Sequence, residues 1–176
     1  MPTTTVLVLC TGNAARSVMA GIMLQGLADE AGAGIRVATG GTHAVDNQPV
    51  SARTRMALLS VDAPSADAVS RHRSHQVQEL DFEKADLVVA MEADHVRYVR
   101  RRYPRAAART ATIRRLCREL PPGPPDLGTR VAALGLADAD LGDDEDVADP
   151  AGGDDARYET CARELLVLCQ ELAGRL

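Results

Sequence analysis

Aromatic residues are scarce in this chain of 176 residues, which has no Trp, one Phe and three Tyr. A buried core must therefore consist of Val, Leu, Ala and Met, and the 45% hydrophobic content and the length suit one domain with such a core. An excess of positive charge is also missing. The formal net charge of −5 argues against a general nucleic-acid binder.

Long apolar runs are missing as well, so we expect no membrane partner. The N-terminal apolar run lacks the basic start and cleavage-type site of a signal peptide. The four cysteines include no Cys-x2-Cys pair, and the histidines show no ligand spacing, so we expect no metal and no other cofactor. Few cysteines, one of them apt for chemistry, fit a reducing compartment, so we expect a cytoplasmic location.

Strand-like and helix-like patterns alternate along the chain. Apolar runs predict strands over residues 4–9, 35–38, 85–91 and 110–116. Helical spacing predicts helices over 18–29, 49–59, 93–103 and 157–172, with a short one over 74–82. This alternation predicts an α/β fold, a single-domain doubly wound four-stranded parallel sheet with helices on both faces.

One segment, 120–148, breaks this rhythm. It opens with Pro-Pro-Gly-Pro-Pro at 121–125 and is long for a plain connection. We expect one domain over 1–176 with this segment as a Pro/Gly/Asp-rich loop insertion containing a short helix at 131–136. It either carries Asp149 toward a site or is a tolerated surface insertion. The acidic residues of 138–155 either pair with the Arg-rich stretch 97–118, or that stretch binds an acidic partner.

The first predicted strand leads directly into Cys-Thr-Gly-Asn-Ala-Ala-Arg-Ser. A strand, a tight turn and a helix start aim backbone N–H groups at an anion. Cys10 at the first position and Arg16 six residues later form Cys-x5-Arg, the phosphate-binding loop of cysteine-dependent phosphatases. Arg16 can hold two phosphoryl oxygens with its planar fork, and the helix N-terminus favours a thiolate at Cys10. The predicted phosphate-binding residues are Thr11, Gly12, Asn13, Ala14, Ala15, Arg16 and Ser17.

With this loop near the N-terminus and Asp149-Pro150 near the C-terminus, the sequence resembles the low-molecular-weight protein tyrosine phosphatase family. Further segments that look like family segments are 39–42, 48–51, 72–74 and 85–91, so the resemblance covers the chain. It implies Cys10 as nucleophile, Arg16 as phosphate ligand and Asp149 as general acid. It also implies that four residues support the loop, namely Asn13, Ser17, Thr39 and His72.

Four positions depart from the family pattern. Ala151 and Gly152 stand where many phosphotyrosine-specific members carry aromatic residues, and Asp-Pro-x-Gly-Gly resembles the bacterial subgroup that includes protein arginine phosphatases. Ala14 is neither the Thr of those enzymes nor the larger apolar residue of tyrosine-specific ones, so specificity stays open. Ala15 replaces a second loop cysteine of many members. We therefore expect Cys10, as an exposed thiolate, to be sensitive to peroxide.

The sequence thus predicts a phosphomonoester hydrolase that forms a cysteinyl-phosphate, with protein tyrosine phosphatase as the main hypothesis and protein arginine phosphatase as the alternative. Arsenate reduction is less favoured, because residues 90–94 lack the two cysteines that it needs. A phosphate-binding module without turnover is disfavoured by the intact Cys10, Arg16 and Asp149. The expected partners are a phosphorylated protein or small phosphomonoester, with inorganic phosphate as product and inhibitor.

Overall fold

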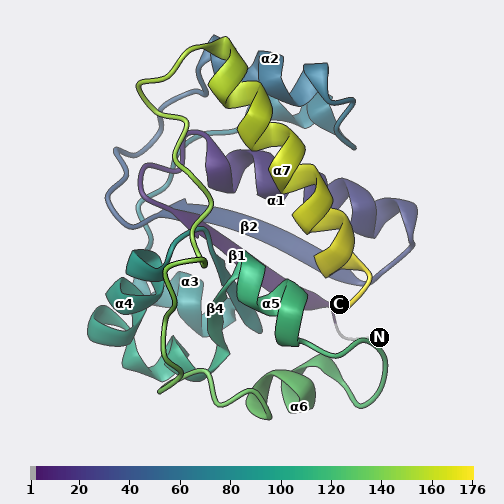
Figure 1. Cartoon of the computed structure of the whole chain (residues 1–176), viewed down its shortest axis with the longest axis vertical. Helices are drawn as coiled ribbons and strands as arrows, with labels where there is room; N and C mark the ends of the chain where they lie inside the picture. The colour runs from purple at the N-terminus through teal and green to yellow at the C-terminus, as the bar shows by residue number, and fades with distance from the viewer. Residues whose placement is uncertain (1–2) are drawn as a thin grey trace.

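A four-stranded parallel sheet with the strand order β2-β1-β3-β4 forms the centre of the structure (Figure 1). The computed structural model describes residues 3–176. The strands are β1 (Thr4–Cys10), β2 (Ile35–Gly41), β3 (Leu87–Ala90) and β4 (Thr110–Thr112). Cys10 pairs with Gly41, and Leu9 pairs with Ala90, so the carboxyl ends of the three longest strands lie at one edge. The predicted α/β fold class is confirmed.

Helices cover both faces of this sheet. The main helices on one face are α1 (Arg16–Glu30), α2 (Ala52–Ser60), α5 (Ile113–Glu119) and α7 (Asp155–Ala173), while α3 (Glu79–Lys84) and α4 (Ala93–Arg102) lie on the other (Figure 1). Two 3-10 helices, Ala66–Arg71 and Pro104–Arg109, and α6 (Leu127–Ala132) complete the structure. Within the described chain, no helix combines the length and apolarity that crossing a bilayer requires.

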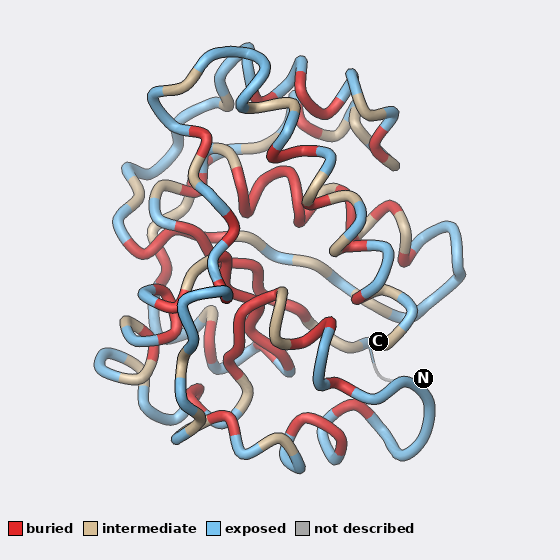
Figure 2. The backbone as a smooth tube through the Cα atoms, viewed as in Figure 1, coloured by how far each residue is buried: buried red, intermediate tan, exposed pale blue. Residues whose placement is uncertain are grey.

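Alternate residues of β1 supply the two halves of the core. Val6 and Val8 face the cluster that includes α1 and α7, while Leu7 and Leu9 face the cluster that includes α3 and α4. Figure 2 shows burial concentrated on the central strands. Phe82 is the one fully buried aromatic ring among the described residues, so the core is aliphatic, as the composition predicts.

Two predicted elements outside the 120–148 segment are wrong in part. The strand predicted over 110–116 ends at Thr112, because the Thr112 hydroxyl accepts a hydrogen bond from the Arg115 N–H and starts α5. The helix predicted over 74–82 begins only at Glu79, because the preceding residues are extended and the Val77 N–H donates to the carbonyl of Gly41.

The segment 120–148 packs on the body of the protein. Its helix lies over Leu127–Ala132 rather than 131–136, with Asp126 as N-cap. Arg130 is buried and donates to the carbonyl groups of Pro121, Pro125 and Arg175, which ties this helix to the C-terminus. Leu136 and Val147 join the main core, so the segment is anchored along its length.

Candidate active site

The loop from Cys10 to Ser17 joins the carboxyl end of β1 to the N-terminus of α1. The N–H groups of Thr11 through Ala15 donate to no acceptor among residues 3–176, although most buried N–H groups in proteins are paired. The Thr11 carbonyl instead accepts from the His43 N–H at 2.9 Å, which leaves the amides free to face the other way. Five consecutive unpaired amides at a helix N-terminus are an arrangement suited to binding an anion.

The thiol of Cys10 lies inside a buried hydrogen-bond network. Cys10 Sγ is 3.0 Å from Ser17 Oγ, and Ser17 Oγ accepts from Asn13 Nδ2 at 2.9 Å. Asn13 Nδ2 also donates to Thr39 Oγ1 at 3.0 Å. When Cys10 is a thiolate, the Ser17 hydroxyl donates to the sulfur. The expectation of an exposed thiol is wrong, because Cys10 is only 3% exposed.

Asn13 is the fixed point of the loop. It adopts a left-handed backbone conformation with φ of 50°, which Asn tolerates and which Gly12 does not adopt here. Its Oδ1 accepts from the His75 N–H at 2.9 Å, and its carbonyl accepts from His72 Nε2 at 3.0 Å. Burial lowers the pKa of His72 despite the bond to Asn13, so the ring is neutral with its proton on Nε2.

A glycine at the end of β2 allows this close approach. A Cβ atom at Gly41 would lie 2.6 Å from the Thr11 carbonyl oxygen and 3.0 Å from the Asn13 nitrogen. Any side chain there would push the loop away from the sheet. The role of Gly41 depends on the register between β1 and β2, which the sequence pattern does not reveal.

Arg16 is buried, with 2% of its side chain exposed, and it contacts three groups. Its Nη1 donates to Glu92 Oε1 and, at 2.9 Å, to the Val147 carbonyl, while its Nη2 donates to Asp149 Oδ2 at 3.0 Å. Its Nε–H donates to no acceptor in the described chain and is free for a ligand in the loop. Arg16 therefore connects the loop to the two segments that carry Glu92 and Asp149.

The segment before Asp149 is fastened to the end of β3. The Val147 N–H donates to the Met91 carbonyl at 2.8 Å, and the Ala93 N–H donates to Asp146 Oδ1 at 2.7 Å. Asp149 itself is 43% exposed, and its Oδ1 accepts from the Ala151 N–H at 2.9 Å. The carboxylate thus contacts Arg16 and is also open to solvent.

A buried ion pair holds the same segment four residues earlier. Glu145 is fully buried, and its carboxylate accepts hydrogen bonds from Thr112 Oγ1 at 2.6 Å and from Arg115 Nε at 2.9 Å. Burial alone would raise the pKa of Glu145, but the bonds from Arg115 and Thr112 outweigh it and lower the pKa. Arg118 donates to Asp144 at 2.9 Å, so internal pairing of the acidic segment is confirmed for these residues.

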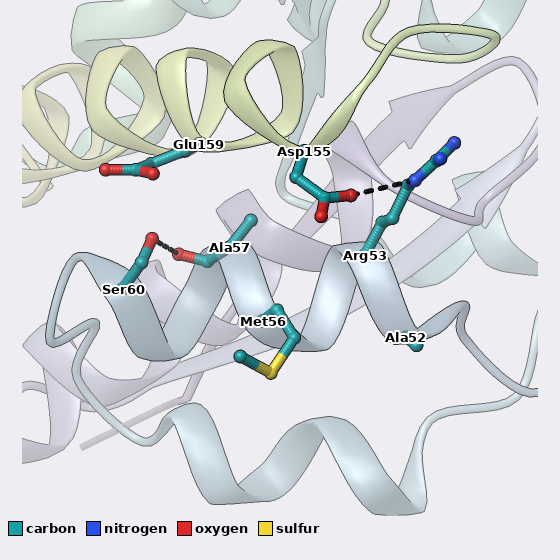
Figure 3. A pocket seen from close by; sticks show the side chains of 7 residues that line it. All are labelled: Ala52, Arg53, Met56, Ala57, Ser60, Asp155 and Glu159. Carbon is teal, nitrogen blue, oxygen red and sulfur yellow. Dashed lines mark hydrogen bonds and ion pairs between the residues drawn. The ribbon is translucent and has the colours of Figure 1, made fainter.

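The segment after Asp149 is tied to α2. Figure 3 shows Arg53 reaching from α2 toward Asp155 at the start of α7, with a nitrogen–oxygen distance of 2.9 Å. Arg53 also donates to the Gly153 carbonyl at 2.9 Å, and Asp154 caps α7 by accepting from the Arg157 N–H. The pocket drawn there, of about 260 Å³, is lined by α2 and α7 and by no residue of the Cys10–Ser17 loop.

Glu92 and His95 are two further site residues that the sequence pattern did not reveal. Glu92 contacts Arg16, and His95 Nε2 lies 3.0 Å from Thr11 Oγ1. Their position directly after the third predicted strand could have indicated both, because residues that follow a parallel strand lie close to those that follow the neighbouring strands.

The remaining cysteines are free and buried, and they lie outside the loop. Burial raises the pKa of Cys117 to about 11 and that of Cys161 to about 12, and it raises the pKa of Cys169 as well. These thiols therefore stay protonated and unreactive at neutral pH. Residues 3–176 contain no cluster of three His, Cys, Asp or Glu side chains that could hold a metal ion.

Comparison with known proteins agrees with this geometry. The family model described as "Low molecular weight phosphotyrosine protein phosphatase" matches residues 5–121. A low molecular weight protein-tyrosine-phosphatase from Streptomyces coelicolor is 33% identical over 158 residues, which cover 87% of this chain and 81% of that protein. A protein-arginine-phosphatase from Geobacillus stearothermophilus is 28% identical over 171 residues, covering 97% and 95%.

Solved structures of both a tyrosine phosphatase and an arginine phosphatase are also similar to this chain. The low molecular weight protein tyrosine phosphatase from T. tengcongensis has a TM-score of 0.79 at 27% identity, covering 99% of this chain and 100% of that one. The arginine phosphatase from Geobacillus stearothermophilus has a TM-score of 0.73 at 26% identity, covering 97% and 90%.

Proposed function

The chain belongs to the low molecular weight phosphotyrosine protein phosphatase family, and from this premise we propose that it hydrolyses phosphotyrosine in proteins, with Cys10 as nucleophile, Arg16 as phosphate ligand and Asp149 as general acid. It is an enzyme of a family whose mechanism is cysteine-dependent, and phosphorylated proteins are the substrates of such enzymes. One observation carries the assignment of roles. Arg16 joins the amide cradle above Cys10 to Asp149 through a 3.0 Å contact, although 133 residues separate Arg16 and Asp149 in sequence.

The first step transfers the phosphoryl group to the enzyme. The Cys10 thiolate attacks phosphorus, the sulfur–phosphorus bond forms, and the bond from phosphorus to the tyrosine oxygen breaks. Asp149 donates its proton to the departing oxygen. The unpaired amides and Arg16 hold the equatorial oxygens, whose charge they stabilise in the transition state. The Ser17 hydroxyl, 3.0 Å from Cys10 Sγ, stabilises the thiolate before attack.

The second step regenerates the thiol group. A water molecule attacks the phosphorus of cysteinyl-phosphate, and Asp149, now a carboxylate, accepts a proton from it. The sulfur–phosphorus bond breaks, the electron pair returns to Cys10, and the Ser17 hydroxyl again donates to the thiolate. Inorganic phosphate leaves as the product and, because it fits the same cradle, it acts as a competitive inhibitor. All positive charge for these steps comes from Arg16 and the backbone.

The supporting residues keep this arrangement rigid. Asn13 links Ser17 to Thr39 and accepts from His72 and from the backbone of His75. The hydroxyls of Ser17 and Thr39 and the backbone N–H of His75 carry no charge, and burial lowers the pKa of His72, so these partners fix the loop without competing for the bound anion.

Phosphoarginine is the second candidate substrate. The relative from Geobacillus stearothermophilus that covers 97% of this chain is named a protein-arginine-phosphatase, which favours this substrate. Ala14 and Ala151 are exposed beside the site and give it small walls, which would accept a flexible arginine side chain as well as a ring. For that substrate, Asp149 would protonate the departing guanidine nitrogen, and the bond broken would be phosphorus–nitrogen.

Turnover of matched peptides separates the two candidates. We expect higher kcat/KM on a phosphotyrosine peptide than on the phosphoarginine peptide of the same sequence. Higher kcat/KM on phosphoarginine would assign the second substrate, with the same residues in the same roles.

Active-site variants test the roles on an aryl phosphate. Cys10→Ser should abolish turnover, and Asp149→Ala should reduce kcat by about 10²–10⁴-fold for a poor leaving group. Turnover by Cys10→Ser at the wild-type rate would rule out the proposed nucleophile. Arg163→Gln, an exposed substitution on α7 remote from the loop in sequence, serves as the control.

A further inference from the structure

The first turn of α4 touches both ends of the phosphate-binding loop. Glu92, the N-cap residue, contacts Arg16 near the end of the loop. His95, three residues later, lies 3.0 Å from the hydroxyl of Thr11 at its start. The His95 side chain is only 4% exposed, so its hydrogen bonds are its main polar contacts. Nothing in the proposed mechanism yet uses this contact.

The partners of His95 fix which ring nitrogen carries the proton. The Glu92 backbone N–H donates to His95 Nδ1 at 3.1 Å, so Nδ1 must be unprotonated. In the neutral ring the proton is then on Nε2, and Nε2–H donates to Thr11 Oγ1. The Thr11 hydroxyl accepts this bond, so its own proton is left for another acceptor. Thr11 is exposed, so that acceptor can be a ligand.

The charges around His95 keep the ring neutral. Burial lowers its pKa to about 4, and the nearby Arg16 guanidinium and His43 ring act in the same direction. Asp94 and Asp149 oppose this shift, and Glu92 Oε2 lies 3.8 Å from Nε2. A second ring proton would face the Glu92 N–H, where two donors would oppose each other. The neutral tautomer is therefore the one that the site holds at physiological pH.

We propose that His95 is a positioning residue for phosphate binding: it donates from Nε2 to Thr11 and thereby directs the Thr11 hydroxyl proton to a phosphoryl oxygen in the loop. Thr11 then binds substrate through its side chain as well as through its backbone. This inference rests on the proposed function, since it adds one ligand to the same cradle. It also explains why a histidine, which can accept from a backbone N–H and donate from its far nitrogen, occupies this buried position.

Binding of inorganic phosphate tests the inference without requiring turnover. Thr11→Val removes the hydroxyl with little change of shape, and His95→Phe removes both ring nitrogens. We expect each to raise the Kd for phosphate about fivefold, the effect of one hydrogen bond. Because both variants remove the same interaction, the Kd of the double variant should exceed the wild-type Kd by no more than about tenfold. Thr11→Ser keeps a hydroxyl and should recover most of the affinity that Thr11→Val loses. The control Arg101→Gln, on the exposed side of α4, should bind phosphate like wild type.

Independent effects would overturn the inference. Effects of the two variants that multiply to about 25-fold would show that Thr11 and His95 do not act through one contact. A Thr11→Val variant that binds phosphate like wild type would show that the hydroxyl is not a ligand. If wild-type enzyme binds phosphate with this pattern but hydrolyses no ester, the proposed hydrolysis is wrong, while the role of Thr11 and His95 in binding phosphate is supported.

The tautomer can be observed directly in the wild-type enzyme, which avoids any folding defect of a variant. Long-range nitrogen–proton NMR spectra of the imidazole rings should show His95 protonated at Nε2 and bare at Nδ1 from pH 8 to below pH 6. Added phosphate should shift the Nε2 resonance. A proton on Nδ1, or no response of this ring to phosphate, would contradict the inference.

Discussion

Removing the buried carboxylate of Glu145 should destabilise the protein far more than removing its exposed neighbour Asp144. Glu145 is fully buried, and the Arg115 side chain is 13% exposed. Within the 120–148 segment, Glu145 carries the only charge in close contact with the Arg115 guanidinium. In Glu145→Gln, Arg115 keeps its burial but loses its buried counter-charge. Asp144 and Arg118 form the matched control, because this pair is 76% and 44% exposed.

The magnitude follows from burial. Loss of one partner of a buried ion pair costs about 3–5 kcal/mol. We expect about 3 kcal/mol, the lower end, because Glu119 lies 3.4 Å from Arg115 and remains as a weaker partner. In a protein of this size, that corresponds to a decrease in Tm of about 6–12 °C. Asp144→Asn should cost less than about 1 kcal/mol, as exposed pairs do.

Thermal and urea denaturation of these variants provide the assay. A double variant, Glu145→Met with Arg115→Met, should recover much of the loss, because no buried charge is left unpaired. The folded-state pKa of Glu145 is lowered, so its stabilising effect is present above its ordinary pKa and is lost as the pH falls through the folded value. The difference in free energy of unfolding between wild type and Glu145→Gln should therefore shrink below about pH 4. Equal Tm values for Glu145→Gln and Asp144→Asn would refute the reasoning.

Three further outcomes are expected. The pKa of His95 is about 4 in the folded protein and about 6.5 in the unfolded chain, so the free energy of unfolding should fall by about 2 kcal/mol as the pH drops from 7.5 to 5. Urea titrations should show that His95→Phe lacks this pH dependence. Asn13→Ala removes the bonds to Ser17 and Thr39, so kcat/KM on an aryl phosphate should drop about 10²-fold, and a change below threefold would contradict the role of the network. Peroxide should inactivate the wild-type enzyme irreversibly, because Ala15 leaves no second thiol in the loop, whereas the activity of Ala15→Cys should return in thiol reductant. Full recovery of wild-type activity in thiol reductant after long exposure to peroxide would contradict this.

The strand–loop–helix arrangement around Cys10–Ser17 could be predicted because its information is local. Cys10 and Arg16 are six residues apart, and the strand before and the helix after them are visible as patterns. The choice of Asp149 as a candidate rested on its proline and the family resemblance. Its approach to Arg16 depends on contacts of Val147 and Asp146 with the end of β3, which no sequence period encodes.

Glu92 and His95 could not be assigned in the same way. They lie 76 and 84 residues from their loop partners, and only the strand order β2-β1-β3-β4 brings them together. The strand–helix boundary at Thr112 was missed for a different reason. Ile113, Leu116 and Cys117 follow helical spacing, but the apolar start of the segment also suits a strand, and the Thr112 cap decides between them.

In the proposed mechanism, Cys10 carries the phosphoryl group during turnover. Rapid acid quenching of the Asp149→Ala variant during turnover of an activated aryl phosphate, followed by peptide mass spectrometry, tests this claim most directly. A good leaving group needs no proton, whereas hydrolysis of the intermediate needs the missing base, so we expect a phosphoryl group on the peptide that contains Cys10. Turnover of the same ester with no phosphoryl group on that peptide, or with one on another residue, would contradict the account.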